Sequence, residues 1–251
     1  MAATARLQVD RLSRRFNDAL EDAKKRGCVD QLNSFIDACK QSHAMMGYTI
    51  ERLHREVSSG TEIFENYYQL EALRVRSERR TGPDWEILRN QVEAELLGGK
   101  PPAEEAIHYG ALTIDKTATN SYGECAVVLR EDMIAHRTSC FEENSGIYWE
   151  THKNIPPGKR SDWATRYMLC IAKLGGKITD KSVNTDFPPL LLNSGKSKRD
   201  DSFIEAQIFG PITARTVEMV SVSARKLRCK RTYWTAIRSK LENSGVKVIE
   251  T

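Results

Sequence analysis

A glutamate stands at the second position of the apolar segment IEAQIFGP, residues 204–211, where its side chain could carry out chemistry. Successive side chains of a strand point to opposite faces, so Glu205 and Gln207 share one face and Ile204 lies on the other. A carboxylate beside a ribose can accept hydrogen bonds from the hydroxyl groups and stabilise positive charge at the anomeric carbon. The alternative interpretation is a solvent-facing edge strand with polar outer positions, which is common in half-buried sheets.

Three further side chains are of types suited to a nucleotide site. His108 and His136 could each act as a base toward an acceptor hydroxyl, although a histidine is more often structural. Arg130 follows the apolar run CAVVL, residues 125–129, and its guanidinium could pair with a pyrophosphate. An arginine that ends a strand at the surface explains the same position.

Three segments carry a family resemblance, and they occur in order along the chain: HYGAL at residues 108–112, RTSCF at 137–141 and IEAQIFGP at 204–211. They resemble the first NAD-binding strand, the Ser/Thr-rich second-strand segment and the catalytic strand of ADP-ribosyltransferases. The sequence is most similar to a bacterial family with Tyr-Gly-Ala-Leu, then Gly-x-Cys and an apolar strand, then Glu-Ala-Gln-x-x-Gly-Pro. That family includes effectors of the CteC type, which attach ADP-ribose to a threonine of host ubiquitin. The resemblance covers roughly residues 107–222.

The resemblance implies roles for the matching residues. Glu205 would be the catalytic carboxylate. Tyr109 stands where the fold commonly has arginine or histidine, and it would stack on or hydrogen-bond the adenosine part of NAD+. Gly110 in the first segment would allow the backbone to approach the ligand closely. The hydroxyls of Thr138 and Ser139 in the second segment would bond the ligand or hold the carboxylate in position. The other expected NAD+-binding residues are Gly110, Arg130, Thr138, Ser139 and Gln207.

The resemblance implies a mono-ADP-ribosyltransferase with NAD+ as co-substrate and a protein as acceptor. Members that modify arginine carry Glu or Gln two residues before the catalytic glutamate, where this chain has Phe203. Phe203 offers no carboxylate or amide to a guanidinium, which argues against an arginine target and is compatible with a serine or threonine hydroxyl. The resemblance further suggests host ubiquitin as acceptor and a secreted toxin or virulence effector that acts in the host cytosol. Without the resemblance, a cytoplasmic protein is expected.

The first hundred residues have helical periodicity. Apolar residues recur at spacings of three to five, which predicts helices over residues 7–26, 30–57, 63–79 and 85–97. The sequence GGKPP at residues 98–102 is a linker signal. Short connections favour antiparallel helices. We therefore expect a helical lobe at residues 1–100 that docks the acceptor protein, and an NAD-binding catalytic domain at residues 101–251.

After the linker the pattern changes to short apolar runs. Residues 125–129, 203–209 and 219–222 have strand length, residues 161–174 fit a helix stopped by a glycine pair, and residues 193–201 form a polar loop. The expected fold class is α+β. The resemblance implies that the second part is a split antiparallel β-sandwich of the ADP-ribosyltransferase type.

Composition restricts the partner and the compartment. The chain of 251 residues has a net charge of +4, and the whole excess lies after residue 100. This small basic excess suits an acidic partner or a phosphate-bearing ligand but is too diffuse to predict a nucleic acid.

The six cysteines lack zinc spacing, so we expect no metal and reduced thiols. No stretch approaches the ~20 apolar residues of a membrane helix. The N-terminus lacks a signal-peptide core, so we expect no membrane contact and no export through a cleaved signal.

A binding module without turnover is the alternative function. Basic residues between positions 225 and 240 alternate with Tyr233 and Trp234, a composition that can bind RNA or single strands. A solvated amphipathic helix explains the same residues. The helical lobe would then bind a protein, and the α/β part would be a scaffold. The sequence contains no P-loop, Gly-x-Ser-x-Gly or Gly-x-Gly-x-x-Gly motif, which argues against an ATPase, an α/β hydrolase and a Rossmann dehydrogenase.

Overall fold

The computed structural model describes residues 2–59, 63–64, 83–97, 107–227 and 230–250. The helices are α1 (Ala2–Arg6), α2 (Val9–Arg26), α3 (Val29–Lys40), α4 (Ile50–Ser58), α6 (Pro83–Leu96), α7 (Glu131–Ile134), α8 (Ser145–His152), α9 (Arg166–Leu174), α10 (Phe187–Leu191) and α11 (Arg231–Asn243). The strands are β1 (His43–Tyr48), β2 (Ile63–Phe64), β3 (Ile107–Thr113), β4 (Cys125–Leu129), β5 (Thr138–Phe141), β6 (Arg160–Asp162), β7 (Glu205–Phe209), β8 (Ile212–Thr213), β9 (Val217–Val222) and β10 (Lys247–Glu250).

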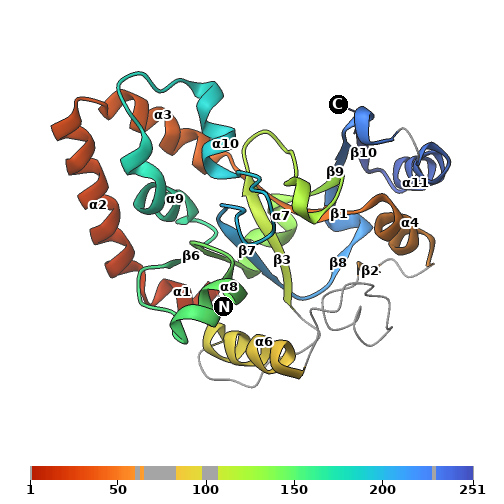
Figure 1. Ribbon diagram of the computed structural model, residues 1–251, viewed down its shortest axis with the longest axis horizontal. Helices are drawn as coiled ribbons and strands as arrows, with labels where there is room; N and C mark the ends of the chain where they lie inside the picture. Colours follow the sequence, from red (N-terminus) through yellow and green to blue (C-terminus); the bar gives the residue numbers. More distant parts are fainter. Residues whose placement is uncertain (1, 60–62, 65–82, 98–106, 228–229, 251) are drawn as a thin grey trace.

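Eight of the strands in the described residues form one sheet in the order β10-β9-β4-β1-β3-β7-β5-β6, and β2 pairs with β8 separately. Neighbouring strands are antiparallel except β9 and β10, which run parallel. Figure 1 shows the strands at the centre, α2, α3, α9 and α10 together at the left, α6 below and α4 with α11 at the right. The α+β class is confirmed. The main sheet is continuous, whereas the resemblance implied two facing sheets.

The predicted helix over residues 30–57 is wrong in its middle, where residues 43–48 form β1. β1 is an inner strand, and the run AMM at residues 44–46 is buried. An inner strand covered on both faces has consecutive apolar side chains, and over so short a run this cannot be distinguished from a buried helix.

The position of β1 also corrects the predicted domain division. β1 lies between β3 and β4, which come from after residue 100, so residues 1–100 do not form a helical lobe separate from the sheet. Residues 63–64, expected to begin a helix, form β2 and pair with β8. The rest of that predicted helix and the linker at residues 98–102 lie outside the described residues.

The other predicted elements are present with shifted ends. Residues 125–129 form β4. The run at 203–209 contains β7, and the run at 219–222 lies within β9. The helix expected over 161–174 begins at Arg166 because residues 160–162 form β6. The first helix ends as predicted at a glycine, since Gly27 adopts a left-handed φ of 69° and its N–H bonds back to the last turn.

The two faces of the sheet bury different side chains. Ala206 and Ile208 of β7 belong to the main core, together with residues of α2, α3, α9 and α10. Alternation turns Glu205 and Gln207 to the opposite face. There α6 and α8 pack on the sheet through an apolar cluster that includes Val92, Phe141 and Tyr148. The predicted alternation along this strand is therefore confirmed, and it assigns the polar side chains to the face under α6 and α8.

His108 lies on the main-core face of β3, because its partner in the register is Ile208. Burial, aided by the charges of Arg137 and Arg52, lowers its pKa from 6.5 to about 4. The imidazole is thus neutral at neutral pH and faces away from Glu205. His136 is exposed on the turn Ala135–Arg137.

The lowered pKa of His108 predicts acid sensitivity. The unfolded chain binds a proton near pH 6.5, whereas the folded chain resists it down to about pH 4. We expect the free energy of unfolding to fall by an amount on the order of 3 kcal/mol as the pH drops through this window. Urea unfolding of His108→Gln should show a smaller loss than the wild type. The exposed-site control His136→Gln should behave as the wild type, and equal losses in all three proteins would contradict the assignment.

Candidate active site

Glu205 is the first residue of β7, an inner strand between β3 and β5. Its side chain is buried, with 3% of the residue exposed, so the interpretation as a solvent-facing edge strand is wrong. One carboxylate oxygen, Oε2, accepts a hydrogen bond from the backbone N–H of Ser145 at 3.2 Å. The other, Oε1, accepts from Nε2 of Gln207 at 2.9 Å. Ser145 is the first residue of α8, and a helix N-terminus favours an anion.

Ser139 controls the orientation of Gln207. Its hydroxyl donates to Oε1 of Gln207 at 3.1 Å, which leaves the amide nitrogen directed at Glu205. The strand register places the side chains of Ser139, Gln207 and Glu205 in one row on this face, because Ser139 is paired with Gln207 and Phe141 with Glu205. The predicted residues Glu205, Gln207 and Ser139 are therefore brought together, with the hydroxyl holding the carboxylate through the amide.

Tyr109 lies on the other side of this row, since its register partner on β7 is Gln207. Its hydroxyl donates to Oε1 of Glu93, a buried residue of α6, at 2.8 Å. Arg89, one turn earlier on α6, stacks its guanidinium on the tyrosine ring at 3.8 Å from the centroid. Arg89 Nη2 is also 3.9 Å from Oε1 of Glu93. A buried cation and a second buried carboxylate thus lie beside the predicted site.

Electrostatics link these groups to Glu205. Burial raises the pKa of Glu205 above its ordinary value of 4.5, and the charge of Arg89 and the bonds from Ser145 and Gln207 oppose this rise. The carboxyl therefore gains a proton more readily than an exposed glutamate does.

Tyr122 covers the adjoining part of the face. Its Cβ and backbone lie against Gly47 of β1, where an added Cβ would be 2.6 Å from the tyrosine Cβ. Its hydroxyl accepts a hydrogen bond from Nδ2 of Asn144, the N-cap of α8, at 3.1 Å. Burial, followed by the charge of Glu205, raises the pKa of Tyr122 to about 12. This ring is therefore a neutral neighbour of the carboxylate.

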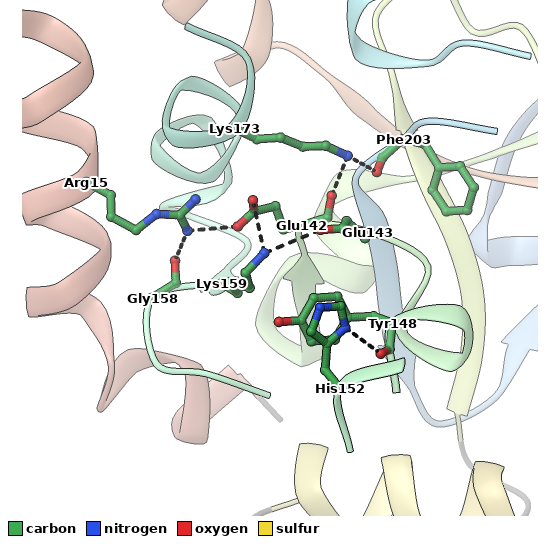
Figure 2. A network of polar contacts seen from close by, with 9 residues as sticks. All are labelled: Arg15, Glu142, Glu143, Tyr148, His152, Gly158, Lys159, Lys173 and Phe203. Carbon is green, nitrogen blue, oxygen red and sulfur yellow. Dashed lines mark hydrogen bonds and ion pairs between the residues drawn. The ribbon is translucent and has the colours of Figure 1, made fainter. Parts of the chain in front are cut away.

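Lys173 of α9 fixes the two chain segments that meet at Glu205. Its ammonium donates to the backbone carbonyls of Glu142 at 2.6 Å and of Phe203 at 2.9 Å, as Figure 2 shows. Phe203 precedes Glu205 by two residues, and Glu142 precedes Ser145 by three. One lysine thus holds both the strand that carries the carboxylate and the approach to the helix that bonds it.

The acidic side chains of the same connection are held as well. Arg15 of α2 pairs with the carboxylate of Glu142 at 2.8 Å, and Lys159 lies 3.5 Å from Glu142 and 3.3 Å from Glu143 (Figure 2). The Lys159 ammonium also lies over the ring of Tyr148 on α8. These contacts join α2 to the segment between β5 and α8 and so support the start of α8.

Three predicted NAD+-binding residues do not lie beside Glu205. Thr138 and Gly110 belong to the main-core face. The hydroxyl of Thr138 donates to the carbonyl of Ile134 at 2.8 Å. A Cβ on Gly110 would be 2.4 Å from the carbonyl oxygen of Met45, so packing of β3 on β1 explains this glycine. Arg130 follows β4, and two strands separate β4 from β7.

Sequence reasoning missed the groups that come from outside the three motif segments. Arg89 and Glu93 are spaced by four residues on a helix, which is typical of an exposed ion pair. Asn144 before Ser145 is a helix N-cap signal, and it could have pointed to free backbone N–H groups at this position. Nothing in the sequence indicates that the middle of α6 packs on β3 or that the start of α8 meets β7.

The basic residues in α11 and directly before it are partly neutralised. Lys230 pairs with Glu51 at 3.0 Å and with Glu124 at 2.6 Å. Arg238 pairs with Glu242 at 2.8 Å. Arg228 lies outside the described residues.

Over the part of the chain that the structure describes, no group of three or more His, Cys, Asp or Glu side chains could hold a metal ion. No described helix has the length and apolarity needed to cross a bilayer.

The chain matches no protein-family model and no curated protein. Among solved structures it is similar to DarTG of Thermosipho africanus in complex with ADP-ribose, with 8% identity and a TM-score of 0.42. The match covers 83% of this chain and 49% of that chain, so this chain spans about half the length of that protein. A likeness at this level identifies neither the family nor the activity.

The raised pKa of Glu205 predicts a dependence of stability on pH. The folded chain holds this proton more tightly than the unfolded chain, so the stability that the protonated carboxyl contributes is lost as the pH rises through the raised pKa. We expect Glu205→Gln, which does not titrate, to gain stability relative to the wild type as the pH rises from about 4 to about 8. Urea unfolding across this range measures the difference. A difference that stays constant with pH would show that the pKa is not raised.

Proposed function

We propose that this chain is an NAD+-dependent protein ADP-ribosyltransferase in which Glu205 is the catalytic carboxylate. The observation that carries the proposal is the placement of this one side chain. It is buried on an inner strand, both of its oxygens accept hydrogen bonds, and Tyr109 and Ser139 lie on the same face. These residues come from the three segments that resemble ADP-ribosyltransferase motifs.

The carboxylate suits a reaction in which positive charge develops on a sugar carbon. Loss of nicotinamide from NAD+ gives the ribose oxocarbenium character, and a nearby anion stabilises that charge more strongly in a buried site than in water. The bonds from Ser145 and Gln207 hold the carboxylate in place before the charge appears. The protein therefore need not reorganise around the transition state.

Arg89 fits the charge of the substrate. It is a buried guanidinium on the same face as Glu205, and a planar fork of N–H donors suits phosphate oxygens. NAD+ carries a pyrophosphate next to the reacting ribose. We assign Arg89 to the pyrophosphate, while Glu205 faces the ribose carbon.

The acceptor in this proposal is a serine or threonine hydroxyl of another protein. The side chain two residues before Glu205 is Phe203, which is buried and meets the ring of Tyr122 edge-on at 6.0 Å. This position offers no acid or amide to a guanidinium acceptor, which supports a hydroxyl target. Ubiquitin as the acceptor, and delivery into a host cytosol, rest on the sequence resemblance alone.

Labelled NAD+ tests the function. We expect the purified chain, incubated with NAD+ labelled in the adenylate phosphate and a eukaryotic cell lysate, to transfer label to protein. Glu205→Gln should reduce the rate about a hundredfold or more, as expected when a transition-state charge loses its partner. Glu95→Gln, which removes an exposed glutamate of α6, should leave the rate unchanged. Labelling that survives in Glu205→Gln would exclude this carboxylate from the reaction.

The pH profile gives a second test of the same residue. Only the ionised carboxylate stabilises a cation, and burial raises the pKa of Glu205 above 4.5. We expect kcat/KM for nicotinamide release to rise with pH through a midpoint above this ordinary value. The residual activity of Glu205→Gln should lack that limb. A limb that persists in the variant would belong to another group.

A further inference from the structure

Glu93 is a second buried carboxylate at this site, and the transition-state stabilisation by Glu205 does not use it. It has no exposed surface, and its Oε1 accepts the phenolic hydrogen bond of Tyr109 at 2.8 Å. Burying an ionised carboxylate costs several kcal/mol unless charge and hydrogen bonds replace the water. Here the protein provides both, with the guanidinium of Arg89 at 3.9 Å and the phenol. The buried Glu93 carboxylate is therefore held in place beside the face of the sheet that carries Glu205.

Tyr109 connects Glu93 to the substrate side of the site. It is half-buried, whereas Glu93 is fully buried, so the tyrosine is the member of the pair with exposed surface. Its partner in the strand register is Gln207, which itself bonds to Glu205. Burial raises the pKa of Tyr109 well above its usual value, so the phenol is protonated at neutral pH and donates its hydrogen bond to Glu93.

We propose that Tyr109 and Glu93 form a proton path that activates the acceptor hydroxyl, an inference that rests on the proposed ADP-ribosyl transfer. The acceptor oxygen forms a bond to the ribose carbon as the bond from that carbon to the nicotinamide nitrogen breaks. The electron pair of the broken bond leaves with nicotinamide. The hydroxyl proton moves to the oxygen of Tyr109, and the phenolic proton moves to Oε1 of Glu93.

The arrangement of the two carboxylates supports separate roles. Glu205 must stay ionised to stabilise the cation, and accepting the proton would remove its charge. Both of its oxygens also hold hydrogen bonds from Ser145 and Gln207. Glu93 bonds directly to the phenol, and Arg89 stacks on the tyrosine ring, where its charge stabilises negative charge that builds up during transfer. Two carboxylates in different environments thus divide the work between charge stabilisation and proton removal.

The test compares nucleophiles that do and do not carry a proton. Nicotinamide release is measured with methanol, a hydroxyl acceptor, and with azide, an anion that has no proton to lose. We expect Tyr109→Phe and Glu93→Gln to lower the methanol reaction on the order of a hundredfold or more, the usual effect of removing a general base. The azide reaction should stay within a few-fold of the wild type and give azido-ADP-ribose. Glu205→Gln should lose both reactions.

Controls separate this proposal from the proposed function. Tyr233→Phe, at an exposed tyrosine, and Glu95→Gln should leave both reactions unchanged. If wild type releases no nicotinamide with either nucleophile, the transferase assignment fails and the proton path fails with it. Two results with an active wild type would overturn the proton path while the role of Glu205 stands. In one, both variants lose the methanol and azide reactions equally, and in the other, both variants keep the two reactions. Thermal melting checks folding, and if Tyr109→Phe does not fold, Glu93→Gln, which keeps a hydrogen-bond acceptor, decides the result.

Discussion

The burial of the Glu205 carboxylate is the constraint on which this site depends. A carboxylate taken out of water must find donors inside the protein, and each donor must stay in place. The backbone of Ser145 and the amide of Gln207 supply hydrogen bonds, and Arg89 supplies positive charge. These groups come from α8, β7 and α6, which are far apart in sequence. The position of one side chain therefore depends on a strand of the sheet and on two helices that pack over the same face of that sheet.

Strand register is what assembles these elements. Residues of β7 alternate between the main core and the face under α6 and α8, so a shift by one residue would bury Glu205 among aliphatic side chains and bring Ala206 to the site. Pairing of β7 with both β3 and β5 opposes such a shift. Lys173 opposes it further by bonding the carbonyl of Phe203 just before the strand. A charged contact outside the site thus adds to the strand pairing that places Glu205 in the site.

Local pattern was sufficient to predict part of the molecule. The period of two in residues 204–209 placed Glu205 and Gln207 on one face, and short apolar runs placed β4 and β9. The same kind of reasoning failed for residues 43–48, because three consecutive buried apolar residues fit either an inner strand or a helix. It also could not find Arg89 and Glu93. Their spacing describes a helix surface, and only the packing of α6 against β3 makes that surface an interior one.

The central place of β1 has a consequence for how the chain is made. β1 leaves the ribosome before either of its neighbours, since β3 and β4 both come from after residue 100. Until those neighbours are synthesised, both edges of an apolar strand lack backbone partners, which is the state most prone to pairing with other chains. Several neighbouring strands of the sheet are also far apart in the sequence, and such topologies fold slowly. During synthesis β1 therefore remains an unpaired apolar strand until the segment through β4 has been made.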